Sequence, residues 1–334
     1  MKKNKEQSSC PFSDRLGKVG GQAVLEGVMM KAGNRMVTTC RKEDGSLVVT
    51  DDEFVSVRQK NKLFDLPLIR GVVSFVESML LSFRTLGASA DALGLEEEEP
   101  SKFEKWLSDK LGLKLTDVVM VVSLILGLGL SALLFIFLPI WVTAGINFLL
   151  GISLGISMPT VVTAILEGLI KMGIFVGYLA AVSMMPDIKR TFMYHGAEHK
   201  SIFCYEKGLE LTVENVREQK RFHPRCGTSF LILMLIVSVL IYQLLLLIPP
   251  IRALSGITWL WTGIKLLALP LICGVGYELI RFCGRHDNWL TRIIAAPGLW
   301  VQRISTKEPD DSMIEVAIAA LSAVIPENTE DDNW

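Results

Sequence analysis

The sequence lacks several features that would place a protein in a common soluble class. No signal peptide is expected, because the first 20 residues are rich in lysine but have neither an apolar core nor a cleavage site. The formal net charge is only −1 and no nucleic-acid-binding motif is present, so we expect no nucleic-acid partner. The six cysteines include no Cys-x-x-Cys pair, which argues against a disulfide framework. We therefore expect the N-terminal part to remain in the cytoplasm.

Apolar sequence, in contrast, is abundant. Half of the residues are hydrophobic, and the long apolar runs lie in the middle of the chain. From Val118 to Leu166 there are 49 consecutive residues without Asp, Glu, Lys, Arg or His. Because one spanning helix needs about 20 apolar residues, this run alone is long enough for two. The composition predicts an integral membrane protein that contacts the lipid bilayer directly.

About four transmembrane helices are expected, because proline and glycine divide the apolar sequence. They are placed at about 118–140, 160–184, 228–248 and 257–280. A short apolar, re-entrant linker is expected between the first two. An alternative division gives three spans in the same region, at 118–138, 142–165 and 168–185.

The distribution of Lys and Arg predicts the orientation of these helices. The segment 185–227 has eight Lys and Arg residues, and 281–307 is also basic. The opposite connections have none (141–159) and only Arg252 (249–256). The positive-inside rule then predicts a multi-pass protein of the cell membrane with both termini in the cytoplasm.

The polar segments complete the expected organisation. Residues 19–55 are expected to be β structure, with strands at 35–41 and 47–50 joined by the turn Glu43-Asp44-Gly45-Ser46. The fold class is an α-helical integral membrane protein with a small α/β cytoplasmic N-terminal domain. The expected order is a disordered tail (1–17), the α/β domain (18–95) with an amphipathic helix (67–88), an acidic linker with an interfacial helix (96–116), membrane helices 1 and 2 (118–184), a cytoplasmic His/Cys loop (185–227), membrane helices 3 and 4 (228–280), and cytoplasmic C-terminal helices with an acidic tail (281–334).

Histidine is scarce, and its distribution indicates a metal site. Three of the four histidines lie between positions 195 and 223. His195 and His199 are four residues apart and so share one face of a helix, and His195-x-x-Glu198-His199 is the order found in inverzincins. We expect both histidines to bind a divalent metal, with zinc the expected ion, and Glu198 to act as general base. The candidates for the remaining ligands are His223, Cys226, Cys204 and Glu278.

The ligand count decides between two kinds of site. Three protein ligands leave a position for water and suit catalysis, whereas a closed set of His195, His199, His223 and Cys226 would be structural. A third interpretation is that the two histidines are simply solvated. Gly196 favours that interpretation, because glycine costs a helix about 1 kcal/mol relative to alanine.

Four ionisable residues inside the expected spans suggest a different class of function. Glu167, Lys171, Lys265 and Glu278 could line the path of a transporter, because charges in a membrane usually face the bundle interior or a wet cavity. Glu167 and Lys171 are four residues apart, so they can also neutralise each other on one helix face. No inverted repeat supports the transporter.

Several blocks of the chain resemble the YqhQ-like family of uncharacterised bacterial membrane proteins. The most specific are Tyr194-His-Gly-Ala-Glu-His-Lys200 and Phe222-His-Pro-Arg-Cys-Gly-Thr-Ser-Phe230. Further matches lie at 20–30, 68–71, 277–281 and 304–318, while Lys31 stands where arginine is expected. The resemblance runs from about residue 18 to 325. It implies a multi-pass membrane protein with a metal, often labelled a metal-dependent enzyme, but it supplies no reaction.

The leading functional hypothesis is a metal-dependent hydrolase whose zinc-type site faces the cytoplasm and whose substrate is associated with the membrane. The alternative is a non-catalytic scaffold or assembly factor, with a structural metal site and a membrane-protein partner.

Overall fold

The computed structural model describes residues 15, 17–94, 106, 110, 115–286 and 288–325. The expected N-terminal tail, acidic linker, interfacial helix and acidic C-terminal tail lie almost entirely outside these residues. The described residues form two compact units. The first unit contains the chain up to Leu93, Ala180–Leu233 and the chain from Cys273 onward, and the second contains Gly94–Leu179 and Met234–Ile272.

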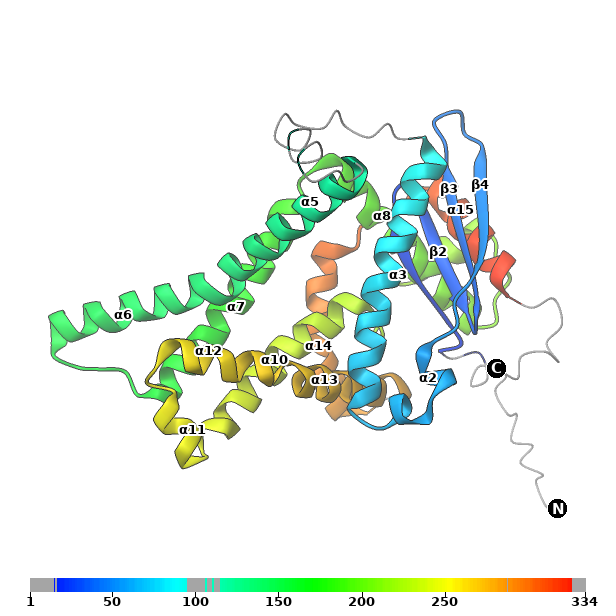
Figure 1. Cartoon of the computed structure of the whole chain (residues 1–334). Helices are drawn as coiled ribbons and strands as arrows, with labels where there is room; N and C mark the ends of the chain where they lie inside the picture. Colours follow the sequence, from blue (N-terminus) through cyan, green and yellow to red (C-terminus); the bar gives the residue numbers. More distant parts are fainter. Residues whose placement is uncertain are drawn as a thin grey trace, which may run out of the picture. The chain divides into compact units, whose positions relative to one another are not determined.

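An antiparallel sheet forms the centre of the first unit (Figure 1). Its four strands neighbour one another in sequence order: β1 (Val19–Val24), β2 (Gly27–Ala32), β3 (Arg35–Arg41) and β4 (Leu47–Glu53). The predicted strands at 35–41 and 47–50 are therefore confirmed, and the second is three residues longer. The turn between them is closed by Asp44, whose carboxylate accepts the N–H of Ser46 at 2.8 Å.

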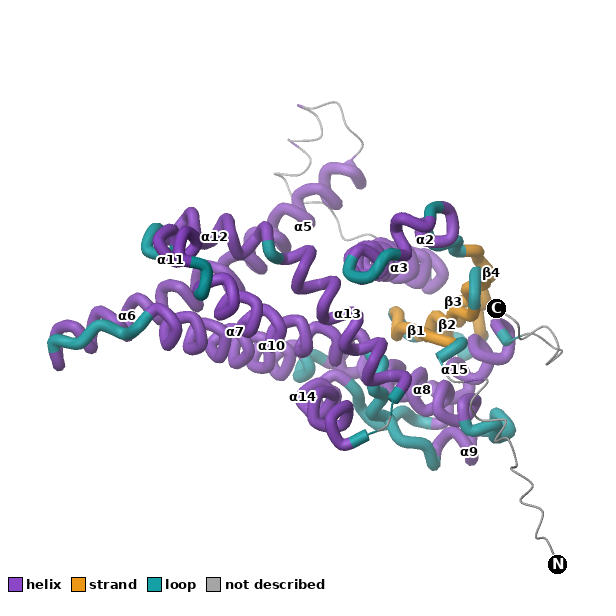
Figure 2. Tube along the Cα trace, turned by 90° about the horizontal axis from the view of Figure 1, so that it is seen from below, coloured by secondary structure: helices purple, strands orange, loops and turns teal. Residues whose placement is uncertain are grey.

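The two faces of the sheet have different partners, because successive side chains on a strand point to opposite sides. Val28 and Met30 lie in one core with α8 (Pro186–Glu206) and α15 (Asp311–Val324). Met29 and Met36 lie in a second core with Leu81 of α3 (Ile69–Leu93). Figure 2 shows the strands between α3 on one side and the pair α8 and α15 on the other. The sheet of the N-terminal segment thus completes its core with helices that are far away in sequence.

The helix α3 confirms the amphipathic helix predicted at 67–88, although it starts and ends a few residues later. It follows a short helix, α2 (Val57–Lys60), and a 3₁₀ turn at Lys62–Asp65. Its last turns are held by Ser89, whose hydroxyl accepts the N–H of Leu25 in the β1–β2 turn at 3.3 Å. That contact joins residues 64 apart, which is why helical periodicity did not predict the extension.

The predicted cytoplasmic loop at 185–227 is largely helical. It consists of α8, the short helix α9 (Val213–Arg217) and an extended segment that leads into α10 (Gly227–Leu246). Pro186 stands at the first position of α8, where its missing N–H is not needed. The remaining helices of the first unit are α14 (Trp289–Ser305) and the part of α13 (Leu269–Arg285) that begins at Cys273.

Three helices in the described residues are long and apolar enough to cross a membrane, and a bent pair of helices makes a fourth candidate. The three are Ile125–Leu154, Thr160–Val182 and Gly227–Leu246. Leu126, Phe148 and Ile152 are 67 %, 67 % and 69 % exposed, so large apolar side chains cover an outer surface. Such a surface suits lipid and indicates association with a membrane.

The first span was predicted at 118–140, but the observed helical segment continues to Leu154. Helix α5 (Leu115–Ala132), a π-helical turn at Leu133–Phe137 and α6 (Leu138–Leu154) follow one another without a gap. The π turn accommodates Pro139, which has no N–H to donate to the preceding turn. The chain leaves the helix only at Gly155, which has a φ of +64°. Gly145 and Gly151 lie within this helix and do not interrupt it.

The second and third predicted spans agree with α7 (Thr160–Val182) and α10, whereas the fourth is broken. Helix α12 (Thr258–Leu267) and α13 meet at Ala268 with a bend of 41°. Pro270 explains the break, because its ring and its missing N–H are incompatible with a continuous helix at this point. A short helix, α11 (Pro249–Leu254), lies between α10 and α12.

A buried charge cluster lies in the second unit. The predicted pair of Glu167 and Lys171 on α7 is confirmed, with 2.9 Å between carboxylate and ammonium. Lys265 of α12 joins it and places its Nζ 2.6 Å from each carboxylate oxygen of Glu167. The cluster therefore contains two ammonium groups and one carboxylate, with Glu167 at its centre. Glu278, the fourth residue of the proposed transporter path, belongs to the first unit and pairs there with Arg70.

Candidate metal centre

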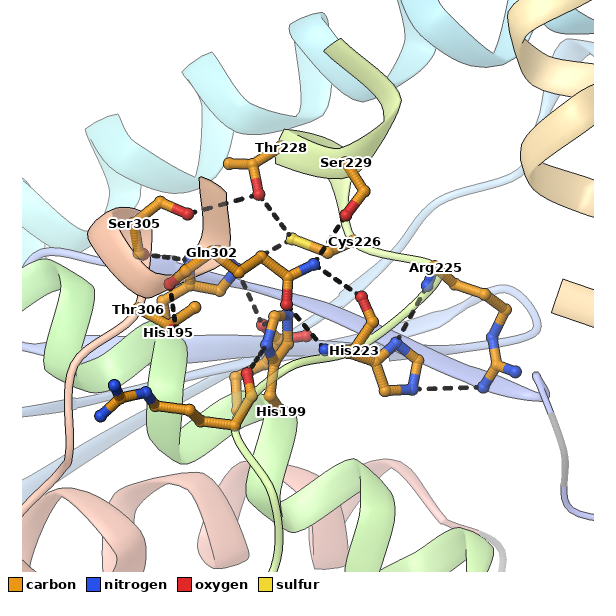
Figure 3. Close-up of polar contacts among 12 residues, drawn as sticks. His195, His199, His223, Arg225, Cys226, Thr228, Ser229, Gln302, Ser305 and Thr306 are labelled. Atoms are coloured by element: carbon orange, nitrogen blue, oxygen red, sulfur yellow. Dashed lines mark hydrogen bonds and ion pairs between the residues drawn. The ribbon is translucent and has the colours of Figure 1, made fainter. Parts of the chain in front are cut away.

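Helix α8 presents the histidine pair to the interior of the first unit. Its second half is almost entirely buried, because β1, α9 and α15 pack around it. His195 and His199 lie one turn apart, and their ring centroids are separated by 4.4 Å. The segment after α9 brings Cys226 to the same point, where its Sγ lies 3.3 Å from Nε2 of His195 (Figure 3). The predicted helical pair and one predicted further ligand thus come together.

His195, His199 and Cys226 form a group that could hold a metal ion. One ligand atom from each residue lies within 4.8 Å of the others. Two imidazoles and a thiolate are a donor set that suits zinc, which binds nitrogen and sulfur ligands. The set contains three residues, which is the number found in zinc sites that keep a position for water or substrate.

Both imidazoles are oriented by the backbone. Nδ1 of His195 is 2.8 Å from the carbonyl oxygen of Ser305, and Nδ1 of His199 is 2.5 Å from that of Arg221. A carbonyl oxygen can only accept, so each Nδ1 donates, and in the neutral imidazole each Nε2 keeps its lone pair. Histidines that bind metals in proteins are usually held by such a hydrogen bond from the second ring nitrogen. The structure therefore fixes the tautomer that a metal ligand needs.

Glu198 is buried beside the same three residues. Its carboxylate lies 3.8 Å from Nε2 of His195 and 3.7 Å from Nε2 of His199, and the residue is 4 % exposed. Among the described residues, its ion-pair partners are these two imidazoles. Gly21 of β1 makes room for it, because a Cβ at position 21 would lie 3.0 Å from Cγ of Glu198. Strand β1 thus closes the site from one side.

The charges at the site favour a thiolate. Burial raises the pKa of Cys226, but the neighbouring His195 and His199 outweigh it and hold this pKa well below 9. Burial lowers the pKa of His195, yet the negative charge of Cys226 opposes this and brings the pKa to about 9. Burial raises the pKa of Glu198 against the opposing effect of the two histidines. Thiolate is the form of cysteine that binds metals and attacks electrophiles.

His223 lies next to the group but makes other contacts. Its ring centroid is 5.5 Å from that of His199, and its Nε2 is 3.7 Å from a carboxylate oxygen of Glu206. Gln302 of α14 holds its backbone, accepting the N–H and donating to the carbonyl at 2.7 Å each. Gln302 is completely buried, and sequence patterns did not single it out. Figure 3 shows this amide between the His223 and Cys226 segments.

Glu278 and Cys204, the other predicted candidates, have partners elsewhere. Both carboxylate oxygens of Glu278 accept hydrogen bonds of 2.5 Å from the guanidinium of Arg70 on α3. The thiol of Cys204 donates to the carbonyl of Glu210 at 3.4 Å. The structure therefore brings together His195, Glu198, His199 and Cys226, and places Glu278 in a different contact of the same unit.

Gly196 is a structural requirement that the sequence did not reveal. A Cβ at this position would lie 2.0 Å from the carbonyl oxygen of Lys307. The close approach lets the N–H of Lys307 bond the carbonyl of Phe192 at 2.8 Å and brings Ser305 next to His195. Glycine within the motif thus allows the segment after α14 to dock on α8. A helix propensity scale records only the local cost of that glycine.

Glu206 provides a test of how the segment beside the site is held. Its carboxylate accepts from Arg225 and, at 2.9 Å, from the N–H of Gly17. Burial raises the pKa of Glu206, but His223, Arg225 and the Gly17 N–H outweigh it, so this pKa lies below its usual value of 4.5. A carboxyl group whose folded pKa is depressed stabilises the fold above its unfolded pKa, and that contribution is lost as the pH falls.

We therefore expect Glu206→Gln to lower the free energy of unfolding by about 2 kcal/mol at pH 7. The difference between variant and wild type should shrink as the pH falls through 4.5 and below. Thermal unfolding in detergent from pH 7 to pH 3 measures both effects. A constant difference over that range would contradict the assignment.

These features define a mostly helical protein with membrane-type apolar helices and a buried His/Cys group beside a small sheet. The chain belongs to the family described as Protein of unknown function (DUF1385), whose model matches residues 66–327. It is 33 % identical over 311 residues to "Uncharacterized protein YqhQ" of Bacillus subtilis (strain 168), an alignment that covers 92 % of each chain. No solved structure matches the chain. The expected YqhQ-like family is therefore confirmed.

Proposed function

We propose that this protein is a membrane-associated, metal-dependent hydrolase whose metal, expected to be zinc, binds His195, His199 and Cys226. The observation that supports this most strongly is the convergence of three ligand atoms within 4.8 Å while both Nδ1 atoms are tied to backbone carbonyls. A chance surface pair of histidines would not be expected to have both rings oriented in this way. The apolar helices support a substrate in or near the membrane.

The chain's own residues have distinct roles in this proposal. When bound, zinc lowers the pKa of a water molecule to about 7 and polarises a carbonyl or phosphoryl group. Glu198 would serve as general base at this site, because its carboxylate lies beside both Nε2 atoms and burial raises its pKa. Ser305 and Arg221 would hold the imidazoles still through their carbonyls, and β1 would exclude bulk water from the Glu198 side.

A structural metal site in a scaffold or assembly factor is the second candidate. The observation that favours it is burial, since Glu198, His199 and Cys226 are 4 %, 2 % and 7 % exposed. A closed site would connect α8, the Cys226 segment and, through Ser305, the end of α14. In this case His223 or Glu198 would complete the shell, and the metal would act on stability alone.

Elemental analysis of the full-length protein, purified from membranes in an uncharged detergent, tests both candidates. Stoichiometric metal is expected in the wild type and a loss of at least about 90 % in His199→Ala and Cys226→Ala, because outer-shell losses alone cost 10- to 100-fold. His286→Ala is the matched control, since His286 is exposed and its Nδ1 lies 3.1 Å from the carbonyl oxygen of Phe282 and not at the His/Cys group. A wild-type protein without metal, even after zinc is supplied, would exclude both candidates.

Glu198→Gln separates the two. The substitution keeps the size of the side chain and removes its basicity. If the site is catalytic, the variant should retain metal and fail to complement a strain that lacks the gene. If it complements fully and keeps metal, the structural candidate is favoured.

A further inference from the structure

A second polar site lies in the first unit, and none of the residues of the His/Cys group lines it. Residues at the start of α3 and along α13 line a pocket of about 530 Å³. Its polar lining comes from Arg70, Glu278, Arg281 and His286, and its apolar lining includes Leu68 and Phe282. Pockets that bind small molecules usually have volumes of about 300–1,000 Å³ and combine apolar walls with a few polar groups.

Arg281 has a buried guanidinium nitrogen that the fold does not use. Its Nη1 is shielded from solvent and has no hydrogen-bond partner among the described residues. Leaving a buried donor unpaired is costly, and a guanidinium does not lose its proton to escape that cost. Arg281 thus brings to the pocket wall a permanently charged guanidinium with an unpaired donor, a group that favours the binding of an anion.

The nearby carboxylates are already committed to other arginines. Glu278 pairs with Arg70 through two hydrogen bonds of 2.5 Å. Asp65, which senses the charge of Arg281, accepts instead from Arg58 at 2.5 Å and 3.1 Å. Among the described residues that line the pocket, two guanidinium groups, those of Arg70 and Arg281, accompany one carboxylate, that of Glu278, which leaves an excess of positive charge. The site therefore suits a phosphate group, which a guanidinium binds through two parallel hydrogen bonds.

The apolar wall matches the rest of such a ligand. Leu68 and Phe282, which line the pocket, are 39 % and 41 % exposed. Helix α13 is the second half of the bent pair that can span a membrane, and Arg281 lies in its last turns. An anionic lipid has a phosphate in its headgroup and apolar chains next to it. A basic side chain beside exposed apolar side chains at the end of a spanning helix matches both parts.

We propose that this pocket binds a phosphate group through Arg281, supplied either by the headgroup of an anionic lipid or by free phosphate. The proposal does not depend on metal binding at His195, and its test does not use the metal. Calorimetric titration of the full-length protein in an uncharged detergent compares three probes: inorganic phosphate, dihexanoyl phosphatidylglycerol and dihexanoylglycerol, which has no phosphate. Saturable binding is expected with at least one of the first two and not with the third.

Arg281→Gln should weaken that binding about 10- to 100-fold, the usual effect of losing charge-assisted hydrogen bonds. Arg303→Gln on α14 is the matched control, because Arg303 is exposed and outside the pocket. It should change the affinity less than about threefold, as expected for a rim charge. If the lipid binds at least tenfold more tightly than inorganic phosphate, the source is the headgroup. Equal affinities identify free phosphate as the ligand.

A second pair of variants avoids any dependence on the folding of Arg281→Gln. Phe282→Glu places a negative charge at the exposed pocket wall and should abolish phosphate binding, whereas Leu290→Glu, also exposed but outside the pocket, should leave it unchanged. The proposal fails if neither phosphate probe binds. It also fails if both arginine variants, or both glutamate variants, weaken binding equally, because that would indicate general surface attraction.

Discussion

Replacing Gly196 by alanine is expected to lower the free energy of unfolding by about 3 kcal/mol or more. The new Cβ would lie 2.0 Å from the carbonyl oxygen of Lys307, and a backbone atom cannot move aside as a flexible side chain can. The segment after α14 would have to leave α8, which also removes the Ser305 carbonyl from His195. Thermal unfolding and metal content should therefore fall together.

The control is the same substitution in another helix. Gly87 lies in α3, is exposed, and has nothing within 4 Å of the position of a Cβ. Gly87→Ala should therefore stabilise the protein, by up to about 1 kcal/mol, because alanine is the better helix former. A similar response at both positions would show that helix propensity, and not the contact with Lys307, determines the effect of Gly196.

Glu167→Gln is expected to destabilise the second unit by about 3–5 kcal/mol, the usual cost of removing one partner of a buried ion pair. The substitution leaves the ammonium groups of Lys171 and Lys265 together in apolar surroundings without their common carboxylate. Lys265 is 7 % exposed and has no easy route to water. Thermal unfolding of the full-length protein in a mild detergent measures the loss.

The charge count of this cluster provides a sharper comparison. Lys265→Met removes the excess positive charge and leaves the neutral pair Glu167–Lys171, so its cost should be smaller, about 1–2 kcal/mol. The double variant Glu167→Gln/Lys265→Met should recover much of the loss caused by Glu167→Gln alone. Equal costs for the two single variants would contradict the view that charge balance maintains the cluster.

The sequence predicted the local elements well because their signals are local. Strand-like residues on either side of a turn predicted β3 and β4. Apolar runs predicted α7 and α10 close to their observed bounds. The errors arose at glycine and proline. The first span was expected to end at about residue 140 but the helix continues to Leu154, and Pro270 was not expected to break the last span. Both outcomes depend on what surrounds the backbone, which a short window of sequence does not contain.

The candidate site was predictable only in part. The i,i+4 spacing identified His195 and His199, and the His-x-x-Cys spacing made Cys226 a candidate. Nothing in the sequence favoured Cys226 over His223 or Glu278 as the third ligand, because all three residue types bind zinc. The structure separates the three candidates by their contacts. Cys226 contacts His195 of the histidine pair, whereas His223 pairs with Glu206 and Glu278 pairs with Arg70.

The sequence by itself determined the family, the apolar helices and the pair of histidines on one helical face, because each depends on residues close together in the chain. Only the tertiary structure decided which residues surround that pair. The carbonyl of Ser305 is 110 residues from His195, and Lys265 is 98 residues from Glu167. Gly21 and Gly196 are needed because another segment of the chain occupies the space that a Cβ would take at each position. Such contacts follow from the packing of the whole chain, since no local pattern encodes which distant segment will fill a given space.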